Sequence, residues 1–531
     1  MEYDFIIVGG GSAGCALANR LSEDGQHHVA LLEAGGKDSS PWIHIPVGYF
    51  KTISNPALNW MYRTEKDPGL NGRALNWPRG KTLGGSSSIN GLLYVRGQAQ
   101  DYDNWRQLGN AGWAWDDVLP YFKRSEKWEG GADEYRGGDG PLSVTHSNRS
   151  WEIIDAWVKA AQEAGFPYNE DYNGVDQEGV GYFQLTAKDG LRCSSSKAYL
   201  TPIRDRANLH VITNVLTEKV LFEGKRATGV SAFRAGERVD YKARFCVVLA
   251  AGSIGSPQIL MLSGIGPEDQ LQGNGIDVLE ARKGVGKNLQ DHLQARPVYK
   301  CALPTINTRT KGLLNHAKIA LQYAMTRSGP MTMAASLGTG YLKTRPELET
   351  PDIQFHVQPF SADDPTTGVH EFDAFTASVL QLRPESTGEL LLNSTDIHDA
   401  PAIHPNYLAT RMDQETLVAG IRIARNICRQ SVLRDVIVQE HAPGPEIDDE
   451  DFDKLLDWAR DTATTIYHPT GTCKMGSDAM SVVDHRLRVQ GVESLRVADA
   501  SIMPQIVSGN TNAPAIMIGE KASDMILEDA R

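Results

Sequence analysis

A glycine-rich turn near the start of the chain constrains the fold more than any other feature of the sequence. Residues 3–8 (YDFIIV) form an apolar run of strand length, residues 9–14 (GGGSAG) follow at once, and residues 15–21 (CALANRL) suit a helix. These patterns predict a strand, a tight turn and a helix in that order. We therefore expect the opening unit of an α/β fold built on a parallel sheet.

Three glycines of this turn have separate physical roles. Gly9 permits the tight turn, Gly11 lets the backbone approach a pyrophosphate, and Gly14 lets the helix pack closely on the strand. Residues 28–32 predict a second strand ending in Glu33, which lies 19 residues after Gly14, near the offset of a ribose-binding carboxylate. The pattern predicts a dinucleotide site, for FAD or NAD before NADP because Glu33 is acidic. The alternative is a glycine turn that binds nothing.

Length and charge exclude several classes of protein. At about 150 residues per domain, 531 residues suggest about three domains, or two with interleaved segments. The net charge of −13 and the absence of a dense Lys/Arg stripe disfavour nucleic acid as a partner. We expect no signal peptide, because the predicted strand begins at residue 3, and no membrane span, because no apolar run approaches about 18 residues.

The cysteines and histidines predict a reduced, metal-free protein. The six cysteines show neither CxxC spacing nor the density of a small secreted domain, and no HExxH or zinc-spaced cluster occurs. We therefore expect a cytoplasmic location. Peripheral attachment to the inner face of a membrane stays open, since a surface-bound enzyme needs no spanning segment.

Two further segments combine small residues with buried-strand patterns. Residues 80–90 (GKTLGGSSSIN) predict a loop that approaches a cofactor closely, and the alternative is a flexible surface linker. Residues 245–250 predict a buried strand that ends in a second small-residue turn at 251–255. Residues 101–190 alternate aromatic clusters with Gly and Asp, and predict loops and short helices over the surface of the core.

These motifs carry a family resemblance. Residues 252–266 (GSIGSPQILMLSGIG) resemble the second signature of glucose-methanol-choline (GMC) flavin oxidoreductases, and residues 80–90 resemble the first. Residues 284–292 (GVGKNLQDH), residues 496–500 (RVADA), His468 in YHPTGT and Asn512 in NTNAP also match. The chain is similar to this family over nearly its whole length, and most of all to bacterial choline-dehydrogenase-like and aliphatic or polymeric alcohol dehydrogenases.

The resemblance implies a mixed α/β and α+β fold with two interleaved domains. A Rossmann-like FAD-binding domain is expected from residues 1–155, 195–300 and 465–531. A substrate-binding domain with an antiparallel sheet is expected from residues 156–194 and 301–464. The family's cofactor contacts carry over to Gly9, Gly11, Ser12, Ala13, Gly14, Glu33, Ala34, Gly84, Gly85, Ser86, Asn90, Gly91, Thr217, Ala251, Asp499, Ala500, Ala513 and Pro514.

The chemistry of alcohol oxidation gives His468 and Asn512 their expected roles. Oxidation removes the hydroxyl proton and transfers a carbon-bound hydrogen as hydride, here to flavin N5. Histidine, with an ordinary pKa near 6.5, can take that proton, and an asparagine can hold the alcohol oxygen without adding charge. The residues alone would allow a capping or surface role for any one of the 14 histidines. The resemblance assigns the base to His468 and the oxygen contact to Asn512.

Two departures from the family narrow the expected flavin linkage and the expected substrate. Ile89 stands where some members carry a histidine bonded covalently to flavin, so we expect non-covalent FAD. Leu337 stands where choline dehydrogenases carry a glutamate suited to a quaternary ammonium, and a leucine cannot neutralise that cation. With Leu337 and Tyr467 in the substrate pocket, we expect a neutral primary alcohol, oxidised to an aldehyde.

The electron acceptor and two rival activities stay open. Reduced flavin could pass electrons to a quinone or other carrier, as in a dehydrogenase, or to oxygen, as in an oxidase. Relatives with this fold also include hydroxynitrile lyases and fatty-acid photodecarboxylases. The latter depend on a cysteine in the substrate domain, and none occurs between Cys301 and Cys428.

Overall fold

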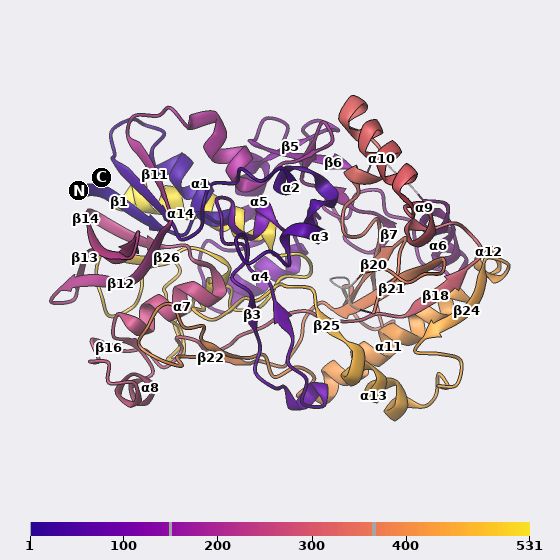
Figure 1. Ribbon diagram of the computed structural model, residues 1–531. Coiled ribbons are helices and arrows are strands. Elements are labelled where there is room, and N and C mark those ends of the chain that lie inside the picture. The colour runs from indigo at the N-terminus through magenta and orange to yellow at the C-terminus, as the bar shows by residue number, and fades with distance from the viewer. Residues whose placement is uncertain (1, 148–150, 364–367, 531) are drawn as a thin grey trace.

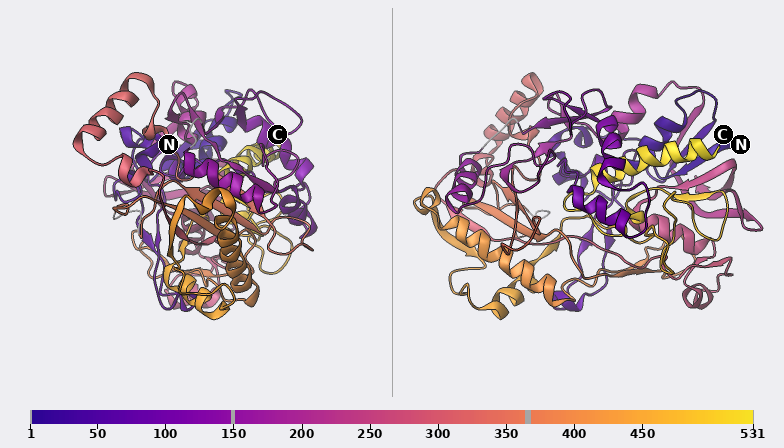
Figure 2. Two further views of the ribbon diagram at one scale, coloured as in Figure 1. Left: turned by 90° about the vertical axis from the view of Figure 1, so that its right-hand side faces the viewer. Right: turned by 180° about the vertical axis from the view of Figure 1, so that it is seen from behind.

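The computed structural model describes residues 2–147, 151–363 and 368–530, and it places two large sheets at opposite ends of one elongated molecule (Figure 1). Both chain termini lie at the end of the molecule that holds the first sheet (Figure 1 and Figure 2, right). Among the described helices, none is both long and apolar enough to cross a membrane.

The first sheet is assembled from strands far apart in the sequence. Its parallel part has the order β11 (Leu209–Thr213), β2 (Val29–Glu33), β1 (Glu2–Val8), β14 (Glu237–Leu249) and β26 (Leu495–Val497). The long β14 continues past β1 into an antiparallel extension with β13 (Arg226–Arg234) and β12 (Val215–Glu223). The strand–turn–helix opening is confirmed, and the helix is α1 (Ser12–Leu21).

Helices cover this sheet because their apolar faces need burial. The C-terminal helix α14 (Asn512–Asp529) packs against α1 and against α5 (Trp115–Ser125). The buried carboxylate of Glu520 on α14 accepts hydrogen bonds from Arg20, Arg124 and Tyr199, so three separate segments are tied to this helix. α7 (Gly252–Leu262) follows β14 and packs against β12.

The second sheet is antiparallel throughout its described ladders, as expected for the substrate domain. Its order is β24 (Ile437–Ala442), β18 (Val298–Cys301), β21 (Ala374–Gln381), β20 (Ile353–Gln358), β19 (Gly338–Leu342) and β7 (Gly179–Tyr182), with β17 (Leu293–Ala295) joining β21 to β25 (Thr464–Thr465). α11 (Arg411–Cys428) covers β21, and α6 (Glu152–Glu163) packs on β19. The fold class is therefore confirmed.

The remaining elements are shorter and join or flank the sheets. The helices are α2 (Pro41–His44), α3 (Tyr49–Thr52), α4 (Ala99–Gln107), α8 (Glu268–Gly273), α9 (Ile306–Arg309), α10 (Leu313–Thr326), α12 (Ser431–Arg434) and α13 (Phe452–Thr462). The helical turns include η1 (Pro46–Gly48), η3 (Gly85–Ser88), η6 (Pro330–Thr332) and η7 (Ala500–Ile502). The small sheets contain β3 (Tyr62–Arg63), β4 (Asn76–Trp77), β5 (Glu126–Trp128), β6 (Leu142–His146), β8 (Gln184–Leu185), β9 (Ala187–Lys188), β10 (Leu191–Arg192), β15 (Ile265–Gly266), β16 (Glu280–Ala281), β22 (Glu389–Leu391) and β23 (Ala402–His404).

The short helices expected within residues 101–190 are present as α4, α5 and α6, but the expected surface position of the aromatic clusters was wrong. The aromatic clusters there belong to the core, since Trp105, Trp113 and Trp157 are fully buried. The Trp105 and Trp113 indoles donate to the carbonyls of Gln505 and His485 at 3.0 and 2.8 Å, so distant segments supply the polar partners. The expected domain boundaries stay predictions; residue 300 falls within β18, and β17 before it already pairs in the second sheet.

Candidate active site

One elongated pocket runs from the turn after β1 to the strands of the second sheet. Parallel strands β1, β2, β14 and β26 end at the same edge of the first sheet, which is where such sheets bind their ligands. The pocket reaches from this edge to residues on or beside β17 and β20, including Gln294, His356 and Gln358.

The glycine turn leaves a clear backbone surface at one end of the pocket. Gly9 has φ +104°, and a Cβ there would lie 2.5 Å from the Ala250 carbonyl oxygen. A Cβ on Gly14 would lie 1.9 Å from the Gly9 carbonyl oxygen, so only glycine allows this helix–strand packing. Gly11 lines the pocket and has no atom within 4 Å of its Cβ position. The N-terminus of α1 therefore faces open space suited to an anion.

Glu33, at the end of β2, is held rigidly beside this turn. Its two carboxylate oxygens accept hydrogen bonds from the Gly10 and Gly35 amides, both at 2.8 Å. Burial raises the pKa of Glu33 to about 7, against the two backbone hydrogen bonds, which lower it. Each oxygen keeps a second lone pair for a hydroxyl donor, as a ribose would supply.

Two more groups line the same end of the pocket. The Asp499 carboxylate accepts from the Gly252 amide at 2.9 Å and from the Ser256 hydroxyl at 2.6 Å, which fixes the turn after β14. The Thr217 hydroxyl oxygen is buried and has no hydrogen-bond partner among the described residues. A long groove with a helix N-terminus, buried carboxylates and an orphaned hydroxyl fits a dinucleotide better than a small ligand.

The loop at 84–91 forms a further wall, which a buried arginine holds in place. Arg192 donates to the Asn90 side-chain oxygen at 2.6 Å and to the Asn90 carbonyl at 2.7 Å. Burial lowers the pKa of Arg192 to about 9. A Cβ on Gly85 would lie 2.7 Å from the Gly11 Cα, so the loop touches the glycine turn. The sequence argument missed Arg192, which sits far from this loop along the chain.

At the other end, His468 lies in a chain of hydrogen bonds. Its Nδ1 is 3.0 Å from His292 Nδ1, and His292 Nε2 is 2.9 Å from the Leu382 carbonyl oxygen. A carbonyl only accepts, so His292 Nε2 carries the proton and neutral His292 accepts at Nδ1. His468 must then donate from Nδ1, which leaves a lone pair on its Nε2.

Burial favours the neutral form of both rings. It lowers the pKa of His292 to about 4, with the Leu382 hydrogen bond acting in the opposite direction. Burial, followed by the neighbouring His292 and His356, lowers the pKa of His468 well below its ordinary value. The lone pair on His468 Nε2 is therefore present at neutral pH, as a proton acceptor requires.

The backbone around His468 is fixed by a buried carboxylate. Asp291 accepts from the His468 amide at 2.7 Å and from the Thr465 and Tyr407 hydroxyls at 2.5 Å each. His292 and His468 also flank the short ladder between β17 and β25, in which Leu293 pairs with Thr465. Asp291 and His292 lie in the matched segment 284–292, but the sequence alone gave them no role.

An asparagine that the sequence argument did not name contacts His468. Asn510 Nδ2 lies 3.0 Å from His468 Nε2, and both side chains line the pocket. Asn512, the residue expected there, accepts at Oδ1 from the Ser12 hydroxyl at 2.7 Å, beside the glycine turn. The reason is local: Asn512 is the first residue of α14, which packs against α1, so its side chain reaches Ser12.

The structure places the other predicted residues as follows. Those that line the pocket are Gly9, Gly11, Ser12, Ala13, Glu33, Ala34, Gly85, Ser86, Asn90, Gly91, Thr217, Ala251, Tyr467, His468, Asp499, Ala500 and Asn512. Gly14, Gly84, Ala513, Pro514 and Leu337 lie outside the lining. Leu337 is buried in the core just before β19, and its neighbour Ser336 lines the pocket instead. Leu337 therefore does not define the pocket wall.

The charges along the pocket are unevenly placed. Among the described lining residues the carboxylates are Glu33 and Asp499, both beside the dinucleotide-type end, and the cations are Arg79 and Arg296. Arg79 donates to the Tyr467 carbonyl at 2.6 Å, next to His468. The end that holds His468 therefore presents positive charge and neutral polar groups.

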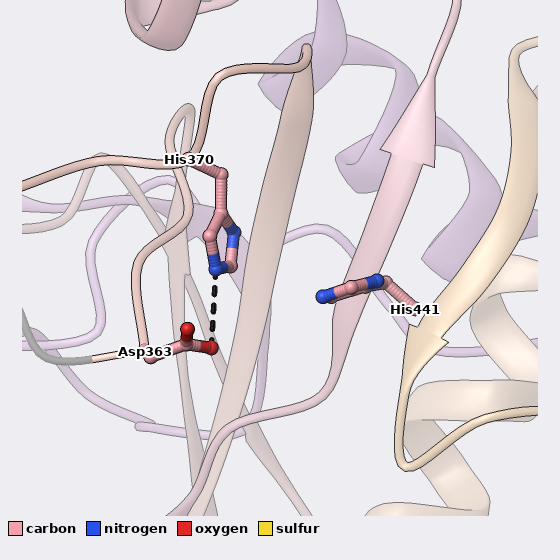
Figure 3. A group of neighbouring side chains, drawn as sticks. All are labelled: Asp363, His370 and His441. Carbon is pink, nitrogen blue, oxygen red and sulfur yellow. Dashed lines mark hydrogen bonds and ion pairs between the residues drawn. The ribbon is translucent and has the colours of Figure 1, made fainter.

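A separate group of titratable side chains lies outside the pocket (Figure 3). His370 Nε2 is 3.1 Å from Asp363 Oδ1, and the His370 and His441 rings lie edge to face with centroids 5.3 Å apart. Burial and then Lys300 lower the pKa of His441, so a lysine already places positive charge there. A hydrogen bond between Asp363 and His370 beside a lysine accounts for the group, and we assign it no metal.

Comparison with known proteins agrees with this geometry. Residues 3–294 and 384–519 match the two sequence profiles of the GMC oxidoreductase family. The chain is 42% identical to an oxygen-dependent choline dehydrogenase of Photobacterium profundum, over 99% of this chain and 93% of that one. It is 41% identical to an alcohol dehydrogenase [acceptor] of Pseudomonas putida, over 99% and 96%.

A solved structure gives the same result. The FAD-dependent oxidoreductase of Chaetomium thermophilum is 28% identical, with a TM-score of 0.91 over 100% of both chains. The chain belongs to the GMC oxidoreductase family.

Proposed function

We propose that the protein is an FAD-dependent dehydrogenase that oxidises a neutral primary alcohol to an aldehyde, with His468 as the base. The observation that carries this proposal is the lone pair on His468 Nε2, directed into the same pocket that the dinucleotide edge of the sheet lines. A proton acceptor and a hydride acceptor are the two requirements of alcohol oxidation, and both fit one cavity.

The residues present fit non-covalent FAD. Gly11 and the α1 N-terminus would hold the pyrophosphate, and Glu33 would bind a ribose. Asp499 and the 84–91 loop would contact the rest of the cofactor. When bound, FAD supplies the two-electron acceptor for the hydride. Ile89 lines the pocket where a covalent link would need a nucleophile, and its side chain offers none.

The side chains at the far end would divide the work on the alcohol. His468 Nε2 would accept the hydroxyl proton. The Asn510 N–H that contacts His468 Nε2 would move to the alcohol oxygen when substrate binds, which frees the single Nε2 lone pair for the hydroxyl proton. His292 would keep His468 in the tautomer with Nε2 unprotonated, which makes it a positioning residue. Asn512 would instead order the cofactor end through Ser12.

The charges near His468 favour a neutral substrate over choline. Arg79 and Arg296 line that region, and the lining carboxylates lie at the other end. A quaternary ammonium would therefore meet like charge, with no carboxylate among the described lining residues at that end, whereas Phe50, Phe360 and Ile466 offer apolar contact to a hydrocarbon chain. The Photobacterium relative is named for choline. Choline is therefore the alternative substrate for this protein.

The acceptor for the second half of the reaction is a quinone or another carrier in this proposal, with oxygen as the alternative. The Pseudomonas relative is named for an acceptor and the Photobacterium relative for oxygen. We place the protein in the cytoplasmic compartment, because its six cysteines are free and buried.

An anaerobic absorbance titration tests the substrate class. FAD-loaded protein is mixed with medium-chain and aromatic primary alcohols, choline, a sugar and a fatty acid, and air is then admitted. We expect neutral alcohols to bleach the flavin band at lower concentration than choline, and recovery in air to be slow. A higher kcat/KM for choline than for every neutral alcohol would reverse the substrate assignment. Cyanide release from mandelonitrile without bleaching, or light-dependent loss of the fatty acid, would replace the dehydrogenase by one of its rivals.

A further inference from the structure

Helix α10 projects from the surface with its apolar side chains exposed. The helix spans Leu313–Thr326 and stands away from the second sheet (Figures 1 and 2). Leu313 and Leu314 are each 88% exposed, Met325 is 75% exposed and Leu321 is 61% exposed. Single exposed apolar residues are ordinary, but four on one short helix form a patch that calls for a partner.

Three of the four exposed apolar residues lie on the side opposite the attachment to the protein. Tyr323 is buried and donates its hydroxyl to the Gly190 carbonyl at 2.9 Å, and Ile319, one turn earlier, is half-buried. At about 100° per residue, Leu314, Leu321 and Met325 share one face, turned roughly 180° from Tyr323. The outward face is therefore apolar along the length of the helix and is left uncovered.

The charge around this helix favours an anionic partner. Residues 305–329 contain four basic residues and no Asp or Glu, in a chain whose net charge is −13. The basic residues are Arg309, Lys311, Lys318 and Arg327. Lys318 lies one turn from both Leu314 and Leu321, where its stem can lie along an apolar surface and its ammonium can reach phosphates. An apolar face bordered by positive charge matches the headgroup region of an anionic bilayer.

We propose that α10 is an interfacial helix that docks the protein on an anionic phospholipid surface. The helix has 14 residues, hence a length of about 21 Å, which suits it to lie in the interface and is too short to span the hydrocarbon core. A second copy of the chain is a poorer partner, because a symmetric contact would bring two basic segments together.

Docking by α10 would bring the pocket wall close to the lipid. The chain continues from α10 into η6 and then to Ala335, which lines the pocket. η6 also packs against η1, which leads directly into the pocket residues Tyr49 and Phe50. The docking proposal does not rest on the proposed reaction, because vesicle binding is measured without substrate.

Vesicle co-sedimentation tests this surface on the FAD-loaded full chain. The vesicles are pure phosphatidylcholine or phosphatidylcholine with phosphatidylglycerol. The variant combines Leu313→Ser, Leu314→Ser, Leu321→Ser and Met325→Ser. The matched control combines Val175→Ser and Val438→Ser, two exposed apolar residues outside α10 (80% and 70% exposed).

We expect the protein and the control to bind the phosphatidylglycerol vesicles, and the α10 variant to bind at least about tenfold more weakly. Lys311→Glu with Lys318→Glu should weaken binding too, and added salt should act in the same direction. Absence of binding to anionic vesicles, or equal binding by the α10 variant, would overturn the proposal. So would a dimer in ultracentrifugation that the α10 substitutions dissociate without a change in vesicle binding.

Discussion

Asn510→Ala and Asn512→Ala form a matched pair that separates two roles that the sequence could not distinguish. Each substitution removes the same kind of side-chain amide, and the two positions are two residues apart in the sequence. Asn510 donates to His468 Nε2 at 3.0 Å, whereas Asn512 accepts from the Ser12 hydroxyl at 2.7 Å. Only the first amide lies where charge changes during proton removal, so only Asn510→Ala should slow the chemical step.

The expected size of the effect follows from the kind of hydrogen bond. A hydrogen bond to a charged group is worth about 1.5–3 kcal/mol, which at about 1.36 kcal/mol per decade is roughly 10- to 150-fold in rate. Asn510→Ala should lower the rate of flavin reduction by that factor. Asn512→Ala removes a neutral hydrogen bond of about 0.5–1.5 kcal/mol, and should weaken FAD retention while changing the reduction rate less than about threefold.

Anaerobic stopped-flow reduction by the best alcohol of the panel measures the first quantity, and titration of the apoprotein with FAD measures the second. Both variants are compared at full FAD occupancy and with their melting temperatures recorded. If Asn512→Ala slowed reduction as much as Asn510→Ala at full occupancy, the assignment of the two amides would be refuted.

Three further predictions concern His292 and the cofactor. His292→Leu removes the acceptor for His468 Nδ1, so it should lower kcat by about tenfold or more and leave KM within about threefold. Burial lowers the pKa of His292 to about 4, so the unfolded chain binds more protons below its ordinary pKa of about 6.5. Unfolding free energy should therefore fall, by about 3 kcal/mol from this residue, as pH drops from about 6.5 to about 4. Heat or acid denaturation should release all FAD into the supernatant, because Ile89 provides no covalent link.

Each of these has an outcome that contradicts it. A rise in KM without loss of kcat in His292→Leu would make His292 a substrate contact. For acid stability, urea unfolding of His292→Leu is the control, and an unchanged pH dependence would remove His292 as its source. Flavin that stays with the precipitated chain would contradict non-covalent binding.

The sequence predicted features that depend on local order along the chain. The strand, the glycine turn and Glu33 follow from periodicity and turn chemistry within one short segment, and they recur in the structure as β1, α1 and β2. The strand expected at 245–250 is the buried end of the much longer β14. The antiparallel second sheet followed from the family resemblance.

Features that depend on three-dimensional placement were missed. Asn510 and Asn512 have the same chemistry, and the start of α14 alone decides which one faces His468. His292 and Arg192 act through carbonyls and side chains distant in sequence, so no spacing marks them. The segment that holds Trp105, Trp113 and Trp157 was expected at the surface because Gly and Asp surround its aromatic residues in the sequence. Distant segments supply carbonyl acceptors for the first two indoles, and Trp157 packs against Phe355.

The most direct test of the account is anaerobic flavin reduction by His468→Ala beside the unaltered protein, with His356→Ala as a second pocket histidine for comparison. The account predicts that His468→Ala keeps FAD but reduces it at least about a hundredfold more slowly, with the loss in kcat. His356→Ala should lose much less, because the side-chain hydrogen bond of His356 goes to Ser336 and not to His468. Rapid reduction by His468→Ala would contradict the central claim that this imidazole takes the alcohol's proton.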